Sequence, residues 1–341
     1  MFSSKKFKSL LAVALMLMMT ALFTACGEEK ADNEKAADNS KKEVVIGTMN
    51  LVNGDLIAQY EKWYENELGM KAKVIKFDSG KDIISALASE SIDIAEAGTS
   101  PAALAISNNL DIKVIFVGDI IGVAETLVAR NDSGISTVKD LTGKKVATPF
   151  ASTAHYSLLN ALKLEDMTES DVQLLDLQPD DIFAAWQRGD IDAAYIWYPV
   201  LGRLLETGRS ITDSEKLAEK GIVTADLVVA RTPFANENPE VVRKFVELQL
   251  KANDMILDDS AKAAKEISSV LEISEQDAAE QITEFKYLRA EDQIKCLDET
   301  MAKTLKDTAD FLVEQKSIKT APDLEKFKSC ITTEYIKADS K

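Results

Sequence analysis

Short apolar segments that resemble strands alternate with helix-like segments through most of this chain. Helices begin where Ser, Thr or Pro can form a first turn, as at Thr99–Ser100–Pro101 and at Ser152 or Thr153. Such alternation is typical of α/β folds with largely parallel sheets. Strands are therefore predicted at residues 43–48, 73–77, 92–97, 144–148 and 191–197, and helices at residues 54–68 and 81–88.

One helix–turn–strand unit occurs twice, at residues 89–95 and again at residues 187–193. We interpret the repeat as one copy in each of two lobes, each a mostly parallel sheet flanked by helices. Two more apolar strands are predicted to cross between the lobes, at residues 125–130 and 226–231. The predicted lobes are residues 43–130 with 226–341, which include helices near the C-terminus, and residues 131–225.

The N-terminus has the features of an export signal. Three lysines precede an apolar run at residues 10–23, which is too short for an ordinary membrane span. Small residues then lead to Cys26, in a pattern that resembles the lipobox of bacterial lipoproteins. We expect residues 1–25 to be a signal peptide and Cys26 to be acylated. Residues 26–42 are predicted to form a flexible tether on the extracytoplasmic face of the cell membrane.

Cys296 and Cys330 are the other two cysteines of the chain. In an exported protein they either pair or remain as two buried thiols. Of these two alternatives, we predict a disulfide between Cys296 and Cys330.

Composition and motifs argue against several classes of function. The formal net charge of −17 disfavours contact with the phosphates of nucleic acids. The chain has a single histidine and no Walker, dinucleotide-binding or G-x-S-x-G motif. We therefore expect a monomer with no catalytic residues, no cofactor, no metal and no nucleic-acid partner.

Several stretches carry a family resemblance, and the most specific is PFASTAHYSLL at residues 149–159, followed by residues 184–192 and 194–197. Together they resemble the taurine-binding proteins of bacterial ABC importers, within the nitrate/sulfonate-type group of substrate-binding proteins. The resemblance implies a type II periplasmic-binding-protein-like fold with two crossover strands. It also implies a small sulfonate ligand such as taurine, and an ABC permease with its ATPase as partners. The loop at residues 49–55 departs from the family pattern, which leaves alkanesulfonates, nitrate and betaine-like zwitterions open as ligands.

The resemblance and the chemistry of a zwitterionic sulfonate together indicate the ligand-binding residues. The sulfonate needs N–H and hydroxyl donors, which the predicted helix N-termini can supply. The ammonium needs carboxylates and aromatic faces. The predicted anion contacts are Thr99, Ser100, Ser152, Thr153 and His155, the predicted cation contacts are Glu125 and Asp226, and Tyr156, Trp197, Thr48 and Met49 are predicted to complete the pocket.

Two other functional classes remain open. The pyrimidine synthases of thiamine metabolism are enzymes of the same two-lobed fold, but they use histidine-rich, cysteine-containing sites, and this chain has one histidine. A sensor protein that presents ligand to a receptor has the same sequence features as a transport protein. Genes for a permease and an ATPase beside this one would favour transport.

Overall fold

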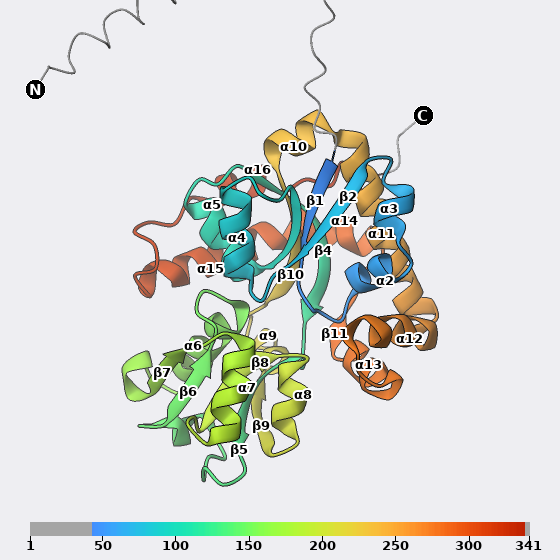
Figure 1. Ribbon diagram of the computed structural model, residues 1–341. Coiled ribbons are helices and arrows are strands. Elements are labelled where there is room, and N and C mark those ends of the chain that lie inside the picture. The colour runs from blue at the N-terminus through green and yellow to red at the C-terminus, as the bar shows by residue number, and fades with distance from the viewer. Residues whose placement is uncertain (1–42, 338–341) are drawn as a thin grey trace, which may run out of the picture. The chain divides into compact units, whose positions relative to one another are not determined.

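The computed structural model describes residues 43–337 of the chain (Figure 1). Cys26, the predicted signal peptide and the predicted tether lie outside these residues. Within residues 43–337, none of the helices combines the length and the hydropathy that a membrane span needs.

The first lobe is built on a six-stranded sheet. Its order is β11-β4-β10-β3-β1-β2, with bounds β1 Glu43–Thr48, β2 Lys71–Lys76, β3 Ile94–Gly98, β4 Ile112–Ile121, β10 Ala225–Arg231 and β11 Phe285–Lys286. Strand β1 pairs in parallel with β2 and β3, whereas β10 lies antiparallel between β3 and β4. The predicted two-lobed α/β architecture is confirmed, although this sheet is mixed and not mostly parallel.

The second lobe repeats this plan with five strands in the order β7-β6-β8-β5-β9. Their bounds are β5 Glu125–Arg130, β6 Lys145–Thr148, β7 Gln173–Asp176, β8 Ala193–Trp197 and β9 Gly208–Asp213. Strand β6 pairs in parallel with β7 and β8, and β5 lies antiparallel between β8 and β9.

The structure corrects the predicted lobe boundaries at strand β5. Strand β5 belongs to the second sheet, so the first segment of the first lobe ends before residue 125 and not at the predicted residue 130. The links between the lobes are residues 122–124, before β5, and residues 219–224, before β10. An apolar pattern shows that a segment is a strand, but not which strands it pairs with, and this caused the error.

Helices cover both sheets (Figure 1). The first lobe has α2 Gly54–Tyr60, α3 Trp63–Glu67, α4 Gly80–Ala88, α5 Thr99–Ser107, α10 Thr232–Glu237, α11 Pro239–Asp258, α12 Ser260–Leu271, α13 Glu275–Ile282, α14 Ala290–Lys295, α15 Ala302–Glu314 and α16 Leu324–Ser329. The second has α6 Thr153–Leu164, α7 Pro179–Arg188, α8 Val200–Leu205 and α9 Ser214–Ala218. The helix predicted at residues 54–68 is broken at Lys62, whose φ of 56° is left-handed.

The second sheet has an apolar layer on each face. Leu127 and Tyr195 pack on one face together with α6, whereas Val128 and Ile196 pack on the other with α7. This follows from the strand geometry, because successive side chains point to opposite faces.

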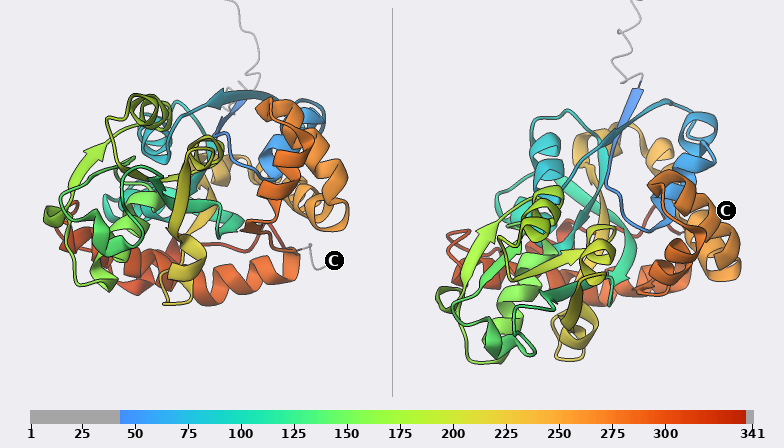
Figure 2. Two further views of the ribbon diagram at one scale, coloured as in Figure 1. Left: turned by 90° about the horizontal axis from the view of Figure 1, so that it is seen from below. Right: turned by 60° about the horizontal axis from the view of Figure 1, so that its bottom comes forward.

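Helix α15 of the first lobe also reaches the second. Phe311 on α15 packs edge-to-face against Tyr156 on α6, with ring centroids 4.9 Å apart. Lys163 and Glu314 form an ion pair of 2.7 Å between the same helices. Figure 2 shows the red end of the chain passing beside the green helices of the second lobe.

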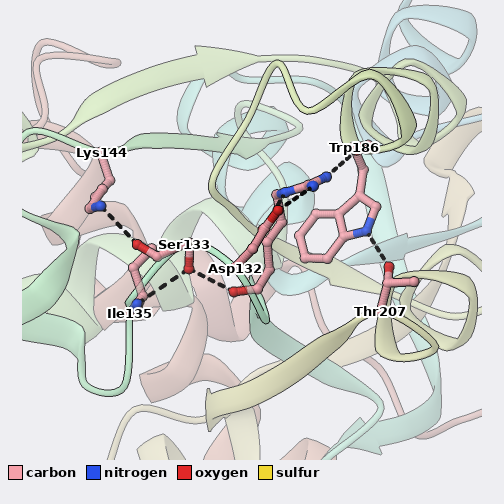
Figure 3. A network of polar contacts seen from close by, with 7 residues as sticks. Asp132, Ser133, Ile135, Lys144, Trp186 and Thr207 are labelled. Carbon is pink, nitrogen blue, oxygen red and sulfur yellow. Dashed lines mark hydrogen bonds and ion pairs between the residues drawn. The ribbon is translucent and has the colours of Figure 1, made fainter.

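A polar network fixes the loop that follows β5 (Figure 3). The Arg130 guanidinium donates to both carboxylate oxygens of Asp132, each at 3.0 Å, and to the carbonyl of Trp186 at 2.5 Å. The buried Trp186 indole donates to the Thr207 hydroxyl at 2.9 Å. This network lies outside the set of residues that line the cavity between the lobes described below.

Cys296 and Cys330 are free thiols, so the predicted disulfide is wrong. Cys296 lies in the π-helical turn between α14 and α15, where its sulfur accepts a hydrogen bond from the Thr300 hydroxyl at 3.6 Å. Cys330 follows α16 and is buried in the core of the first lobe. A count of two cysteines carries no information on whether their positions satisfy disulfide geometry.

Candidate functional site

A small cavity of about 30 Å³ lies where the two lobes meet. Both lobes line it. The lining residues are Met49, Leu51, Gly80, Gly98, Pro101, Ile121, Asp226 and Phe285 from the first lobe, with Ala124, Glu125, Ser152, Thr153 and Trp197 from the link and the second lobe.

The topology brings these residues to one edge of each sheet. Parallel strands β1 and β3 end at the cavity, and antiparallel β10 begins there, with Asp226 directly opposite Gly98. In the second sheet, β6 and β8 end at the cavity and β5 begins there, with Glu125 opposite Trp197. The carboxyl ends of parallel strands are the usual place for ligand sites in open α/β sheets.

Glu125 is a buried carboxylate held by three hydroxyl groups. Thr153 donates to it at 2.5 Å, Ser214 at 2.9 Å and Ser157 at 3.2 Å. Burial raises the pKa of Glu125 to about 7, although the three hydroxyl donors favour the charged form. At pH 7 the Glu125 carboxyl is therefore about half protonated.

Asp226 faces the same cavity from the first lobe. Burial first, and then the charge of Glu125, raise its pKa to about 7. Behind it lie the buried carboxyls of Glu96 and Asp119, whose pKa values burial and their acidic neighbours raise well above the usual range. Asp119 has no hydrogen-bond partner for either oxygen within residues 43–337. This wall of the cavity therefore favours a cation.

Two helix N-termini at the cavity favour an anion instead of a cation. Helix α5 starts at Gly98, and the buried hydroxyls of Thr99 and Ser100 behind it have no partner in the described chain. Helix α6 is capped by Ser152, whose hydroxyl accepts from the His155 amide at 3.1 Å and donates to the Pro149 carbonyl at 2.6 Å. First-turn N–H groups and the helix dipole favour an anion.

The structure brings six of the predicted residues to the cavity: Met49, Glu125, Ser152, Thr153, Trp197 and Asp226. Thr48, Thr99 and Ser100 are buried next to lining residues but do not line the cavity themselves. The Thr48 hydroxyl donates instead to Asp55.

His155 does not line the cavity. Its Nδ1 accepts from the Ala151 amide at 3.4 Å, and its ring stacks on Phe150 with centroids 4.4 Å apart. Burial lowers the pKa of His155 to about 4, although the charge of Asp176 opposes this. The side chain is therefore neutral at physiological pH and sits beside the helix start, not in contact with the cavity.

Tyr156 also points away from the cavity, which corrects its predicted place beside the ligand. Thr153 and Ser157, four positions apart on α6, face Glu125, whereas Tyr156 packs against Phe311. Helical spacing puts residues i and i+4 on one face, so the pair at 153 and 157 was a usable signal for Ser157. No such signal existed for Phe285, which enters from a two-residue strand.

Comparison with known proteins places the chain among binding proteins. Residues 51–263 match the protein family described as NMT1/THI5 like. The chain is 38% identical over 268 residues to the taurine-binding periplasmic protein of Escherichia coli (strain K12), which covers 77% of this chain and 83% of that protein.

Solved structures confirm the two-lobed α/β fold. The alkanesulfonate-binding protein SsuA from Xanthomonas axonopodis pv. citri, bound to MOPS, has a TM-score of 0.72 and 22% identity, covering 86% of this chain and 99% of that one. The desulfurization enzyme DszB has a TM-score of 0.64 and 16% identity, covering 87% and 98%. The fold therefore occurs in binding proteins and in an enzyme.

Proposed function

This chain belongs to the NMT1/THI5-like family of two-lobed α/β proteins, and from that premise we propose that it captures taurine, or a similar small sulfonate, and delivers it to an ABC importer. The observation that carries the proposal is the cavity between the lobes, which sets two buried carboxyls against the N-termini of two helices. The partners it implies are an ABC permease and its ATPase, served by a monomeric binding protein.

A short zwitterion fits this arrangement of charge. Burial of either charged end away from water is costly unless the cavity supplies replacement partners. Glu125 and Asp226 supply them for an ammonium, and Trp197 and Phe285 add aromatic faces beside it. The helix starts at Gly98 and Ser152 supply N–H groups and a favourable dipole for a sulfonate.

The proposed role is capture and release without chemical change. Neither a histidine nor a cysteine occurs among the described residues that line the cavity. Its polar side-chain groups are two carboxyls, two hydroxyls and the Trp197 indole N–H, and the Thr153 hydroxyl already donates to Glu125. These groups suit recognition of charge better than attack on a sulfonate.

We further propose that Cys26 is acylated and anchors the protein on the extracytoplasmic face of the membrane. The support is the basic, apolar and small-residue sequence that precedes Cys26. Labelling with palmitate should mark the wild-type protein and be lost in Cys26→Ala. Equal labelling of the two proteins contradicts the anchor.

A calorimetric panel tests the ligand. Taurine should bind more tightly than ethanesulfonate, longer alkanesulfonates, nitrate, sulfate and betaine. Loss of one member of a buried charge pair typically costs about 2–5 kcal/mol. Asp226→Asn should therefore weaken taurine binding on the order of 30- to several-thousand-fold, and should affect ethanesulfonate, which has no amine, far less.

Asp190→Asn is the matched control. It makes the same chemical change at an exposed carboxylate that pairs with Arg188 and does not line the cavity. It should leave both affinities unchanged. Equal losses for taurine and ethanesulfonate in Asp226→Asn would mean that Asp226 supports the fold and does not contact the ammonium. Tighter binding of betaine than of taurine would assign the cavity to a quaternary ammonium.

A further inference from the structure

The backbone conformation at Gly98 does not require glycine. It is the last residue of β3 and the N-cap of α5, with φ of −61° and ψ of 162°. This extended conformation is open to every L-residue, so conformational freedom does not explain a glycine here.

What position 98 lacks is room for a side chain. A Cβ on Gly98 would lie 2.7 Å from the Cγ2 methyl of Thr153, well inside the 3.5–4.0 Å of an ordinary carbon contact. Gly98 belongs to the first lobe and Thr153 to the second, and both line the cavity. The lobes therefore meet at this point, where the Thr153 methyl group packs against the backbone of Gly98.

Thr153 has little freedom to move aside. It is β-branched, so few χ1 rotamers are open to it. Its hydroxyl donates to Glu125 at 2.5 Å, and Glu125 is itself held by Ser157 and Ser214. Rotation of the Thr153 methyl away from Gly98 would break the hydrogen bond to the buried carboxyl.

The same contact relates the two carboxyls of the cavity. Asp226 is the direct cross-strand partner of Gly98, so its position follows that of Gly98. Glu125 is tied to Thr153 by their hydrogen bond. The separation of Gly98 and Thr153 therefore fixes how far apart the acidic groups of the two lobes stand.

We propose that the contact of Gly98 with Thr153 is the stop that limits how closely the two lobes approach each other, and that it sets the spacing of Glu125 and Asp226 around the cationic end of the ligand. The reading of a cationic end rests on the proposed function, whereas the contact between the lobes does not. Gly98 is thus a specificity-determining position that makes no polar contact with the ligand through a side chain.

The first test is a cycle of three variants measured by calorimetry with taurine. Gly98→Ala should fold normally but weaken binding about 5- to 150-fold, equivalent to the roughly 1–3 kcal/mol of an overpacked contact. Thr153→Ser deletes the methyl that forms the contact and keeps the hydroxyl that donates to Glu125, so it should change the affinity for taurine and serves as the reference for the double variant. The double variant Gly98→Ala/Thr153→Ser should recover most of the lost affinity.

The second test does not depend on the ligand. A Cβ on Gly98 would lie 2.7 Å from the Thr153 Cγ2 and 3.6 Å from its Oγ1, with no other Thr153 atom nearer, so cysteines at 98 and 153 would have Cβ atoms about 4 Å apart, within disulfide range. Gly98→Cys/Thr153→Cys should therefore crosslink under oxidation, with the 98–153 peptide pair identified by mass spectrometry. A matched pair, Gly98→Cys/Ser157→Cys, should crosslink much less, because Ser157 lies one turn further along α6.

The outcomes separate the two proposals. Wild-type affinity in Gly98→Ala, or a double variant as weak as Gly98→Ala, overturns the stop. Failure of the wild-type protein to bind taurine overturns the proposed ligand and leaves the crosslink to decide. Formation of the 98–153 crosslink then supports the stop, and its absence overturns it.

Discussion

Taurine binding should strengthen as the pH rises from 6 to 8. Glu125 and Asp226 line the cavity, and burial raises the pKa of each to about 7. Both carboxyls are therefore mostly protonated at pH 6, where they are poor partners for an ammonium. The ligand amine does not titrate in this range, because alkylammonium groups such as that of lysine have pKa values near 10.

The magnitude follows from the two pKa values. A group with a pKa of about 7 is roughly one tenth ionised at pH 6 and roughly nine tenths ionised at pH 8. If one ionised carboxylate is needed, the affinity for taurine should rise about tenfold across this window, and if both are needed, about a hundredfold. Ethanesulfonate brings only an anion, so its affinity should stay constant or fall as the carboxyls ionise.

Isothermal calorimetry in two buffers of different ionisation enthalpy measures this directly. At pH 7 taurine binding should release about one proton in total, since each of the two groups is about half protonated. Repetition with Asp226→Asn should reduce both the proton release and the slope of affinity against pH. A taurine affinity that is constant or falls from pH 6 to 8 would refute the reasoning from buried, protonated carboxyls.

Three other results are expected. The ligand-free protein should lose stability as the pH rises from about 4 to above 7, because the folded pKa values of Glu125 and Asp226 lie above the ordinary 4.5 and 3.8. The free energy of unfolding should fall by up to about 1.4 kcal/mol per pH unit for each of the two groups. Thermal unfolding should show a falling Tm, which taurine should partly restore at pH 8. Ser214→Ala removes one hydroxyl donor from Glu125 and so raises its pKa further, which should weaken taurine binding several-fold at pH 7 and much less at pH 8.5. Tyr156→Phe should leave the taurine Kd unchanged by calorimetry, because this ring packs against Phe311 and not against the cavity, and a marked loss would return Tyr156 to the site.

Local features of the site were predictable because they depend on short-range chemistry. Ser152 reads as a helix cap in the sequence, and its hydroxyl does accept from the His155 amide. Glu125 and Asp226 stand out as carboxyls at the heads of apolar strands, and the structure places both at the cavity. An acid in such a position is conspicuous because burial makes it costly without a partner.

Features that depend on pairing between distant segments were not predictable. The apolar pattern of β5 gives no preference between the two sheets, so its membership was assigned wrongly. Tyr156 is an amphipathic residue near the expected site, and only the position of α15, far along the chain, shows which way it faces. The free thiols of Cys296 and Cys330 likewise depend on three-dimensional positions that the count does not contain.

The order of strands in the two sheets has a consequence for how the chain folds during synthesis. All five strands of the second sheet lie between residues 125 and 213, so this lobe can form as soon as its own segment has emerged. The first sheet cannot be completed then, because β4 joins β3 only through β10, which begins at Ala225. Until β10 arrives, the apolar edge of β3 stays open to pairing with other chains. Synthesis of the N-terminal lobe thus begins first and ends last, and a chain cut short before residue 225 would carry all five strands of the second sheet beside an aggregation-prone, incomplete first sheet.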